Sequence, residues 1–582
     1  MQIFRRLLSF GLIAALVMSA PIVLSAQRVP VEAEHGLVTS AHELASRAGL
    51  EILQKGGNAI DAAVATGLAL TATFPFAGNI GGGGFMLIHL ADGRDVAIDY
   101  RETAPASASR DMYVDPSGKL RQGPGSSTVG WKASGVPGTV AGFALALEKY
   151  GSGKISWSEV VEPARRLAAE GHPVSQWTAA NLRQWAKLLA QFPESKAIYL
   201  KNGEFHPAGE IWVQADLADT FARLQKNGPR EFYEGETARR IANAMTNHGG
   251  NLTLADLKNY RPVERTPLRG KYRGYEIVMM PPPSSGGVAL LQMLGMLEPF
   301  DVGALGYNSS AKYHLFAEVM KRAFRDRAEY LGDPAFVEVP VARLLDPAYL
   351  KARMADFSPD RATPASAVLP GLGKFVSHPP RESTETTHFS VVDAAGNAVS
   401  NTYTLNGAYG SGVTIPDTGI LMNNEMDDFT SQVGTPNMFG LIQGEANAIA
   451  PGKRPLSSMT PTFVLKDAKV VLITGSPGGP TIINTVLQVI TNVIDHGMPI
   501  TQAVEAPRIN EQWMPDLITF EHYGISPDVA NALKGRGHTL KERQSYEGGF
   551  QGDAESIAID PVSGLRSGAA DPRRADAKAV GF

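Results

Sequence analysis

The pattern of residues changes at residue 386, from predominantly helical to predominantly strand-like. Residues 140–270 alternate amphipathic helical patterns with short turns, and residues 355–385 are rich in Pro, Ser and Ala. After 386 come five short runs rich in β-branched residues, and then a helical stretch at 481–495. The order of these patterns predicts a mixed α/β protein in which a helix-dominated front part and a strand-rich back part meet at a linker or exposed loop.

Local signals place the first elements. Ser40 and Glu43 have the spacing of a capping box, which predicts that a helix starts there. Asn58 begins a second, Ala-rich helix that extends to about Leu70. Four glycines at 81–84 precede an apolar run at 85–88, which predicts a buried strand.

The first 26 residues have the organisation of a secretory signal peptide. Arg5 and Arg6 are followed by a nearly continuous apolar stretch at 7–18, and the small residue Ala26 marks a cleavage point. An uncleaved membrane anchor is the alternative, because the apolar stretch approaches the ~20 residues needed to span a bilayer. We expect cleavage, and hence a periplasmic or secreted protein. No later stretch of 18 apolar residues occurs, so we expect no membrane association afterwards.

Composition excludes several classes of function. The chain has 582 residues, which predicts two to four domain-sized units, and a net charge of −4 without a basic run, so nucleic acid is not an expected partner. It has no cysteine, which excludes disulfides, thiolate metal sites and cysteine nucleophiles.

Common catalytic motifs are absent. The segment at 475–478 has no G-x-S-x-G spacing, and Gly452-Lys453 is followed by Arg454 rather than the Ser or Thr of a P-loop. The 12 histidines show no metal-ligand spacing. We therefore expect neither a metal nor a cofactor.

Thr386 stands just before the first strand-like run, Phe389 to Asp393, where the loose segment ends. A turn signal at 394–397 separates this run from the next, Ala398 to Leu405, which predicts a hairpin. A threonine at the start of a strand is ordinary, and an internal threonine hydroxyl has no local base. If the chain were cut just before Thr386, the new α-amino group, with a pKa of about 7.7, could take the proton from its own hydroxyl.

Several longer motifs accompany this threonine, and together they resemble the bacterial gamma-glutamyltransferases, which are N-terminal nucleophile hydrolases. The resemblance runs from about Ala41 to the C-terminus. The matching segments are Thr386 to Asp393, Thr402 to Asn406, Asn423 to Phe429, Arg454 to Met459, Thr474 to Gly479, and Arg101 to Pro105.

The resemblance implies a precursor that cleaves itself between Glu385 and Thr386. Residues 27–385 would form a large subunit and residues 386–582 a small one, associated as a heterodimer. The implied fold is a four-layer αββα sandwich assembled from both subunits. The implied activity is removal of the gamma-glutamyl group from glutathione and related compounds, through an acyl-enzyme on Thr386. Water or an amino acid or dipeptide then accepts the group.

The resemblance also assigns the catalytic groups around Thr386. Thr404 corresponds to the threonine whose hydroxyl bonds the nucleophile's oxygen; otherwise it is a strand residue facing solvent. Gly478 and Gly479 correspond to the pair whose backbone N–H groups form an oxyanion hole. An ordinary turn is the alternative for these two glycines.

The substrate's amino-acid head would be bound by groups of matching charge. An arginine fork and two hydroxyls suit its carboxylate, and two acids with an amide oxygen suit its ammonium. These residues are Arg101, Ser457 and Ser458 for the carboxylate, and Glu425, Asp428 and Asn406 for the ammonium. A surface salt bridge for Arg101 and Asp428, and a helix cap for the serines, are the alternatives.

One position departs from a common bacterial pattern. Residues 434–447 resemble the lid loop over the glutamyl site, but Phe439 stands where many relatives have tyrosine. Phenylalanine can shield the site but cannot hydrogen-bond Asn406, so we expect looser closure of the lid.

Two other functions remain open. A cephalosporin (glutaryl) acylase would share the fold, but its substrate has no amino group and would not need Asp428. A non-catalytic protein that binds gamma-glutamyl peptides would not need an intact Thr386.

Overall fold

The computed structural model describes residues 28–373, 386–433, 435, 437–438, 440–441, 443–543 and 550–582. The predicted signal peptide at 1–26, Glu385 and Phe439 lie outside the described residues. Within these ranges, no helix is both long enough and apolar enough to cross a membrane.

Two seven-stranded antiparallel sheets form the centre of the molecule. The order in the first sheet is β21 (Lys578–Gly581), β2 (Gly36–Ser40), β10 (Thr387–Asp393), β11 (Ala398–Thr404), β3 (Gly83–His89), β4 (Asp95–Asp99) and β7 (Val263–Arg265). The order in the second is β1 (Val31–Ala33), β20 (Arg566–Ala569), β19 (Ser556–Ile559), β15 (Lys469–Thr474), β14 (Thr462–Lys466), β9 (Tyr275–Met279) and β8 (Leu268–Tyr272).

The alternation of side chains along the strands shows that the first sheet is covered on both faces. In β3, Met86 and Ile88 belong to a core shared with helices, whereas Phe85 and Leu87 belong to a core shared with the second sheet. Because a strand buried on both faces has no polar side, β3 is a continuous apolar run.

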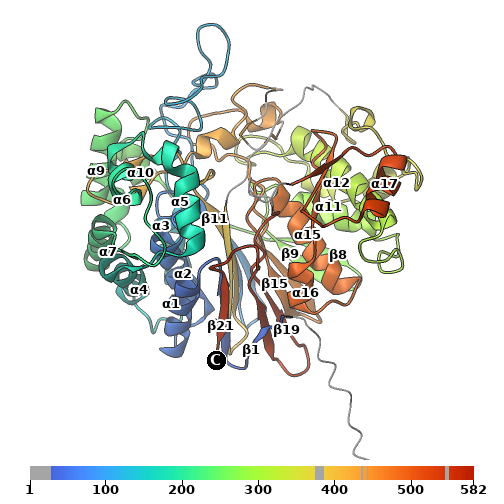
Figure 1. Cartoon of the computed structure of the whole chain (residues 1–582), viewed down its shortest axis with the longest axis horizontal. Helices are drawn as coiled ribbons and strands as arrows, with labels where there is room; N and C mark the ends of the chain where they lie inside the picture. The colour runs from blue at the N-terminus through green and yellow to red at the C-terminus, as the bar shows by residue number, and fades with distance from the viewer. Residues whose placement is uncertain are drawn as a thin grey trace, which may run out of the picture.

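Helices cover the two outer faces (Figure 1). The helices beside the first sheet include α1 (Glu43–Gln54), α2 (Ala59–Thr73), α3 (Thr139–Tyr150), α4 (Trp157–Glu170) and α7 (Ala215–Asn227). Those beside the second sheet include α11 (Gly286–Leu297), α12 (Ser310–Tyr330), α15 (Thr481–Ile494) and α16 (Ile500–Glu505). The predicted four-layer αββα sandwich is therefore confirmed.

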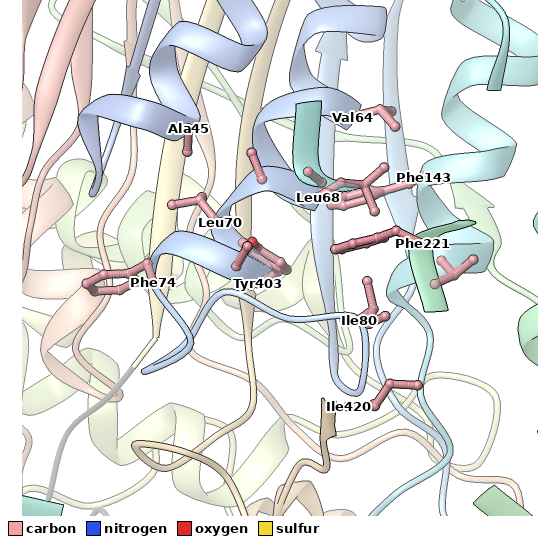
Figure 2. Close-up of a cluster of buried hydrophobic side chains, with 14 of the residues drawn as sticks. Ala45, Val64, Leu68, Leu70, Phe74, Ile80, Phe143, Phe221, Tyr403 and Ile420 are labelled. Atoms are coloured by element: carbon pink, nitrogen blue, oxygen red, sulfur yellow. The ribbon is translucent and has the colours of Figure 1, made fainter. Parts of the chain in front are cut away.

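Helix α2 lies at the centre of the first helical layer. All of its residues are buried, which matches its Ala-rich sequence without a polar face. Figure 2 shows Leu68 and Leu70 of this helix near Phe143 of α3 and Tyr403 of β11. This packing fixes the back of strands β10 and β11.

Both sheets combine strands from the two sides of residue 386. In the first sheet β10 lies between β2 and β11, and in the second β14 lies between β15 and β9. The predicted front and back parts are thus not separate units, because they share their sheets.

The local predictions have mixed outcomes. The hairpin around the 394–397 turn is confirmed, with strands at 387–393 and 398–404, and so is helix α2. The capping box at Ser40 is wrong: Ser40 pairs with Phe389 as the last residue of β2, so His42 caps α1. The front part also contains strands such as β8 and β9, which the sequence patterns did not reveal. These strands are short and mix polar with apolar residues, so their periodicity is weak.

Candidate active site

Thr386 directly precedes β10 and is buried, with 4% of its surface exposed. The antiparallel register pairs Thr387 with Tyr403, so the next pair along the ladder is Thr386 and Thr404. Thr404 is 3% exposed, so the alternative of a solvent-facing strand threonine is wrong. The strand pairing alone brings the two hydroxyl residues together.

A small cavity of about 20 Å³ adjoins both threonines. Nine of the residues predicted for the site line it: Arg101, Thr386, Thr404, Asn406, Glu425, Asp428, Ser457, Ser458 and Gly479. Leu441, Met459 and Ile482 complete the lining. The cavity is about the size of one water molecule, so a larger ligand requires movement of the lining side chains.

Arg101 is the electrostatic centre of this site. It follows β4, and its side chain pairs with Glu425 through Nη1 and with Asp428 through Nη2. Only 1% of its surface is exposed, so the alternative of a surface salt bridge is wrong. Burial opposes the charged form, but Glu425, Asp428 and Glu102 outweigh it and raise the pKa of Arg101.

Glu102 and Glu425 form a coupled pair of buried carboxyl groups. Glu102 is fully buried, and burial raises its pKa to about 7 although Arg101 opposes this shift. Burial also raises the pKa of Glu425 well above its ordinary value. Burial thus favours the neutral form of both carboxyl groups, and the neutral form of either one reduces the excess of negative charge around Arg101.

Asn406 is held by contacts behind the cavity. Its Nδ2 donates to the carbonyl oxygen of Asn424 at 3.0 Å, so the amide oxygen is the atom that can accept from an ammonium. Its backbone has a φ of 75°, a left-handed conformation that asparagine tolerates better than most residues.

Gly478 and Gly479 lie at the N-terminus of α15 and have φ values of 129° and 54°. In the described part of the chain, neither backbone N–H donates to a protein group. The φ of Gly478 is one that L side chains rarely adopt, and a Cβ there would also approach Thr481 Oγ1 to 2.4 Å, so both observations favour glycine at this position. Two free N–H groups at a helix N-terminus can stabilise a developing oxyanion, although only Gly479 lines the cavity.

Ser457 and Ser458 lie between the short 3-10 turn at Glu445–Asn447 and strand β14, and no helix begins or ends beside them in this described part of the chain, so the helix-cap alternative is wrong. Ser457 forms an isolated bridge with Ser284 and accepts from Ser285 N at 2.7 Å through its carbonyl oxygen. This bridge holds the Ser457–Ser458 segment against the start of α11.

Described residues of the predicted lid lie at the cavity. Leu441 lines it, and Asn437 Nδ2 donates to Asp428 Oδ1 at 3.2 Å. Met438 N donates to Asp427 Oδ2 at 2.8 Å. The role of Phe439 remains a prediction.

The family profile described as Gamma-glutamyltranspeptidase matches residues 45–581. The chain belongs to the gamma-glutamyltranspeptidase family. It is 46% identical to a glutathione hydrolase proenzyme from Escherichia coli, an alignment that covers 95% of this chain and 93% of that protein.

Acylases are also similar to this chain in sequence and in fold. A Pseudomonas protein named acylase ACY 1 proenzyme is 41% identical over 94% of this chain and 93% of its own length. The crystal structure of a cephalosporin acylase from Bacillus halodurans superposes with a TM-score of 0.82 at 28% identity, covering 98% of this chain and 99% of that one. The fold therefore does not distinguish the two activities.

Sequence reasoning assigned no role to two buried charged residues near this site. Glu102 follows Arg101 directly, and Arg327 lies on α12 beside Ser458. The charges of α12 are typical of a solvated helix face, so no local pattern indicates that Arg327 is buried.

One group of side chains in the described residues has the geometry to bind a metal, namely His314, Glu318 and His538. It is separate from the residues that line the cavity. The Glu318 carboxylate already pairs with Arg322 at 2.6 Å and accepts a hydrogen bond from Thr363 N at 2.9 Å. We therefore assign no metal to this group.

Proposed function

We propose that this chain is a self-cleaving gamma-glutamyltransferase and glutathione hydrolase. It removes the gamma-glutamyl group from glutathione and related compounds and transfers it to water, an amino acid or a dipeptide. The observation that carries the proposal is a single cavity lined by Thr386 together with Arg101, Glu425 and Asp428.

The first step is cleavage of the precursor. The Thr386 hydroxyl attacks the carbonyl carbon of Glu385, the C–N bond breaks, and the chain is joined through an ester. Water then hydrolyses the ester, giving a carboxylate at Glu385 and a free α-amino group at Thr386. The subunits 27–385 and 386–582 stay together as a heterodimer, since each sheet contains strands from both.

The mature site then performs acyl transfer. The α-amino group of Thr386 accepts the proton of its hydroxyl, whose oxygen attacks the gamma-carbonyl carbon of the substrate. The N–H groups of Gly478 and Gly479 stabilise the oxyanion, and the Thr404 hydroxyl bonds the nucleophilic oxygen. The amine leaves with a proton, and a gamma-glutamyl ester remains on Thr386. Attack by water gives glutamate, and attack by an amine gives a new gamma-glutamyl amide.

Recognition of the substrate is an exchange of ion pairs. A zwitterionic amino-acid head brings one carboxylate and one ammonium. Its carboxylate takes the Arg101 fork and the hydroxyls of Ser457 and Ser458, and its ammonium takes Asp428 and Glu425. The site's own pairs are therefore replaced by pairs with the substrate, and no charge is left buried and unpaired.

The glutaryl acylase is the second candidate, because acylases share the fold and considerable identity. The position of Asp428 favours the transferase. Asp428 lines the cavity and pairs with Arg101, where it meets the ammonium that a glutaryl group lacks. The non-catalytic binding protein is disfavoured by the intact pair of Thr386 and Thr404.

We also propose that residues 1–26 are a signal peptide that directs export to the periplasm or the medium. The basic pair Arg5-Arg6, the apolar stretch that follows and the small residue Ala26 support this. N-terminal sequencing of the large subunit from an exported preparation would identify the cleavage point.

The decisive experiment combines intact mass spectrometry with an assay on gamma-glutamyl and glutaryl p-nitroanilides, with and without glycylglycine. We expect two chains, the smaller starting at Thr386, and release of p-nitroaniline from the gamma-glutamyl compound that glycylglycine accelerates. A preference for the glutaryl compound would support the acylase instead. A single unprocessed chain without turnover would support the binding protein.

A further inference from the structure

Arg327 is a buried guanidinium directly behind the pair of serines that face the cavity. It lies near the end of α12, and only 1% of its surface is exposed. Its Nε donates to Ser285 Oγ at 2.8 Å, and its Nη2 donates to Ser458 Oγ at 3.1 Å. Its Nη1 has no hydrogen-bond partner among the described residues.

These contacts hold both cavity serines. Ser285, which receives the Nε bond, donates its own hydroxyl to the carbonyl oxygen of Ser457 at 2.6 Å. Arg327 is thus connected directly to Ser458 and, through Ser285, to the backbone of Ser457. The Arg327 side chain therefore holds in place both Ser457 and Ser458, the residues that we assign to binding the substrate carboxylate.

The bond to Ser458 also determines the direction of its hydroxyl. An arginine can only donate, so Ser458 Oγ is the acceptor and its own proton is free for another acceptor. A hydroxyl that accepts from a cation is polarised and becomes a stronger donor. Ser458 lines the cavity, so this donor is available to an anionic group there.

Arg327 also differs from its neighbours on α12 in its charge partners. Arg322 pairs with Glu318 and Asp356, and Arg325 pairs with Glu329. Among the described residues, no carboxylate lies within salt-bridge distance of Arg327. Burial lowers the pKa of Arg327 to about 10, although the negative charge of Asp428 opposes this shift. The Arg327 guanidinium therefore still carries a positive charge at neutral pH. A buried cation without a partner is costly, and an anionic ligand nearby would offset that cost.

We propose that Arg327 is a positioning residue for the substrate carboxylate: it orients the Ser458 hydroxyl toward that carboxylate and supplies a second positive charge behind it. The inference rests on the proposed function, since it takes the carboxylate to be that of a gamma-glutamyl group. Arg101 would bind the carboxylate directly, whereas Arg327 would act through Ser458.

The test compares Arg327→Met with the wild type on two substrates, gamma-glutamyl-p-nitroanilide and 4-aminobutanoyl-p-nitroanilide. The second compound keeps the ammonium but lacks the α-carboxylate. We expect kcat/KM for the gamma-glutamyl compound to fall roughly tenfold or more, mainly through a higher KM, because the Ser458 hydroxyl is no longer oriented to donate to the substrate carboxylate and a hydrogen bond to a charged group is lost. The value for the second should change little. Turnover by the wild type tests the proposed function separately.

A double-mutant cycle with Ser458→Ala distinguishes positioning from a general structural effect. If Arg327 acts mainly by orienting Ser458, Arg327→Met should lose most of its effect in the Ser458→Ala background, and only the smaller contribution of its charge should remain. Full effects in both backgrounds, or equal losses on both substrates, would overturn the proposal.

Arg325→Met is the matched control, because Arg325 is equally buried on the same helix but pairs with Glu329 and stacks on Trp513. It should leave the ratio of the two substrates unchanged. If Arg327→Met does not process itself into two chains, Arg327→Lys replaces it, since lysine keeps the charge but not the fork. An intermediate loss of discrimination supports the proposal, and wild-type discrimination in the lysine variant refutes it.

Discussion

Thr386 lies opposite Thr404 at the open end of the β10–β11 hairpin, in the register set by the pairing of Thr387 with Tyr403. The tight turn at 394–397 is at the other end, so the turn fixes this register over the six residue pairs from Val392–Ala398 to Thr387–Tyr403. A slip of one residue would move one threonine to the opposite face. The relationship depends on hairpin geometry, whereas the rest of the site depends on contacts between distant segments.

Thr386→Ala should remain a single chain and be inactive, because both cleavage and catalysis use the same hydroxyl. Intact mass spectrometry and a denaturing gel would show this. Thr386→Ser retains a hydroxyl and should still process itself, at a reduced rate. Cleavage at the same bond in the alanine variant would mean that another group is the nucleophile.

Thr404→Val should keep the shape of the side chain but remove its hydroxyl. We expect kcat to fall roughly fivefold or more, because a hydrogen bond of about 1 kcal/mol to the nucleophilic oxygen is lost. Thr404→Ser, which retains the hydroxyl, should recover most of the rate. Steady-state kinetics on the gamma-glutamyl anilide measure both variants, and equal losses in the two would indicate a packing role.

Asp428→Asn should weaken turnover of the gamma-glutamyl anilide and spare the glutaryl anilide, which has no ammonium. Loss of one partner of a desolvated charge pair costs on the order of 2–5 kcal/mol. Asp427→Asn is the control, because Asp427 accepts from Ser127 and Met438 instead of lining the cavity. The two variants should differ in substrate preference, and a shared, substrate-independent loss would make Asp428 structural.

Glu102 should make the enzyme less stable as the pH rises. Burial raises its pKa to about 7 in the folded protein, from about 4.5 in the unfolded chain. Between these two pH values the folded state therefore binds more protons than the unfolded chain. The contribution of Glu102 to the free energy of unfolding is fully present below pH 4.5 and is lost as the pH rises through about 7. Thermal melting from pH 5 to 8 should show this fall, and Glu102→Gln should reduce it.

Glu511→Gln provides a comparison for that experiment. Burial raises the pKa of Glu511 to about 8, but this residue does not line the cavity. Glu102→Gln and Glu511→Gln should each make the melting temperature depend less on pH. Only Glu102→Gln should also change the pH dependence of KM for the gamma-glutamyl anilide, since Glu102 is coupled to Glu425 and Arg101. An unchanged KM profile would limit Glu102 to a role in stability.

Much of the fold could be predicted from local sequence. The hairpin at 387–404 has strong β-branched runs and an Ala-Ala-Gly-Asn turn, and α2 has a cap and an apolar, Ala-rich sequence. Ser40 shows the limit of such reasoning, because its capping pattern is overridden by strand pairing with Phe389. The four-layer arrangement came only from the resemblance of motifs, since the order of strands in the sheets leaves no local signal.

The sequence by itself determined which residue types are available for acyl transfer. Its motifs matched these residues to positions in the gamma-glutamyltransferases. It also fixed the pairing of Thr386 with Thr404, because a short hairpin leaves little freedom of register. Only the tertiary structure decided that Arg101 is buried between Glu425 and Asp428, and that Arg327 of a charge-rich helix is buried behind Ser458. Burial and charge pairing arise from segments more than a hundred residues apart, so no local pattern can encode them.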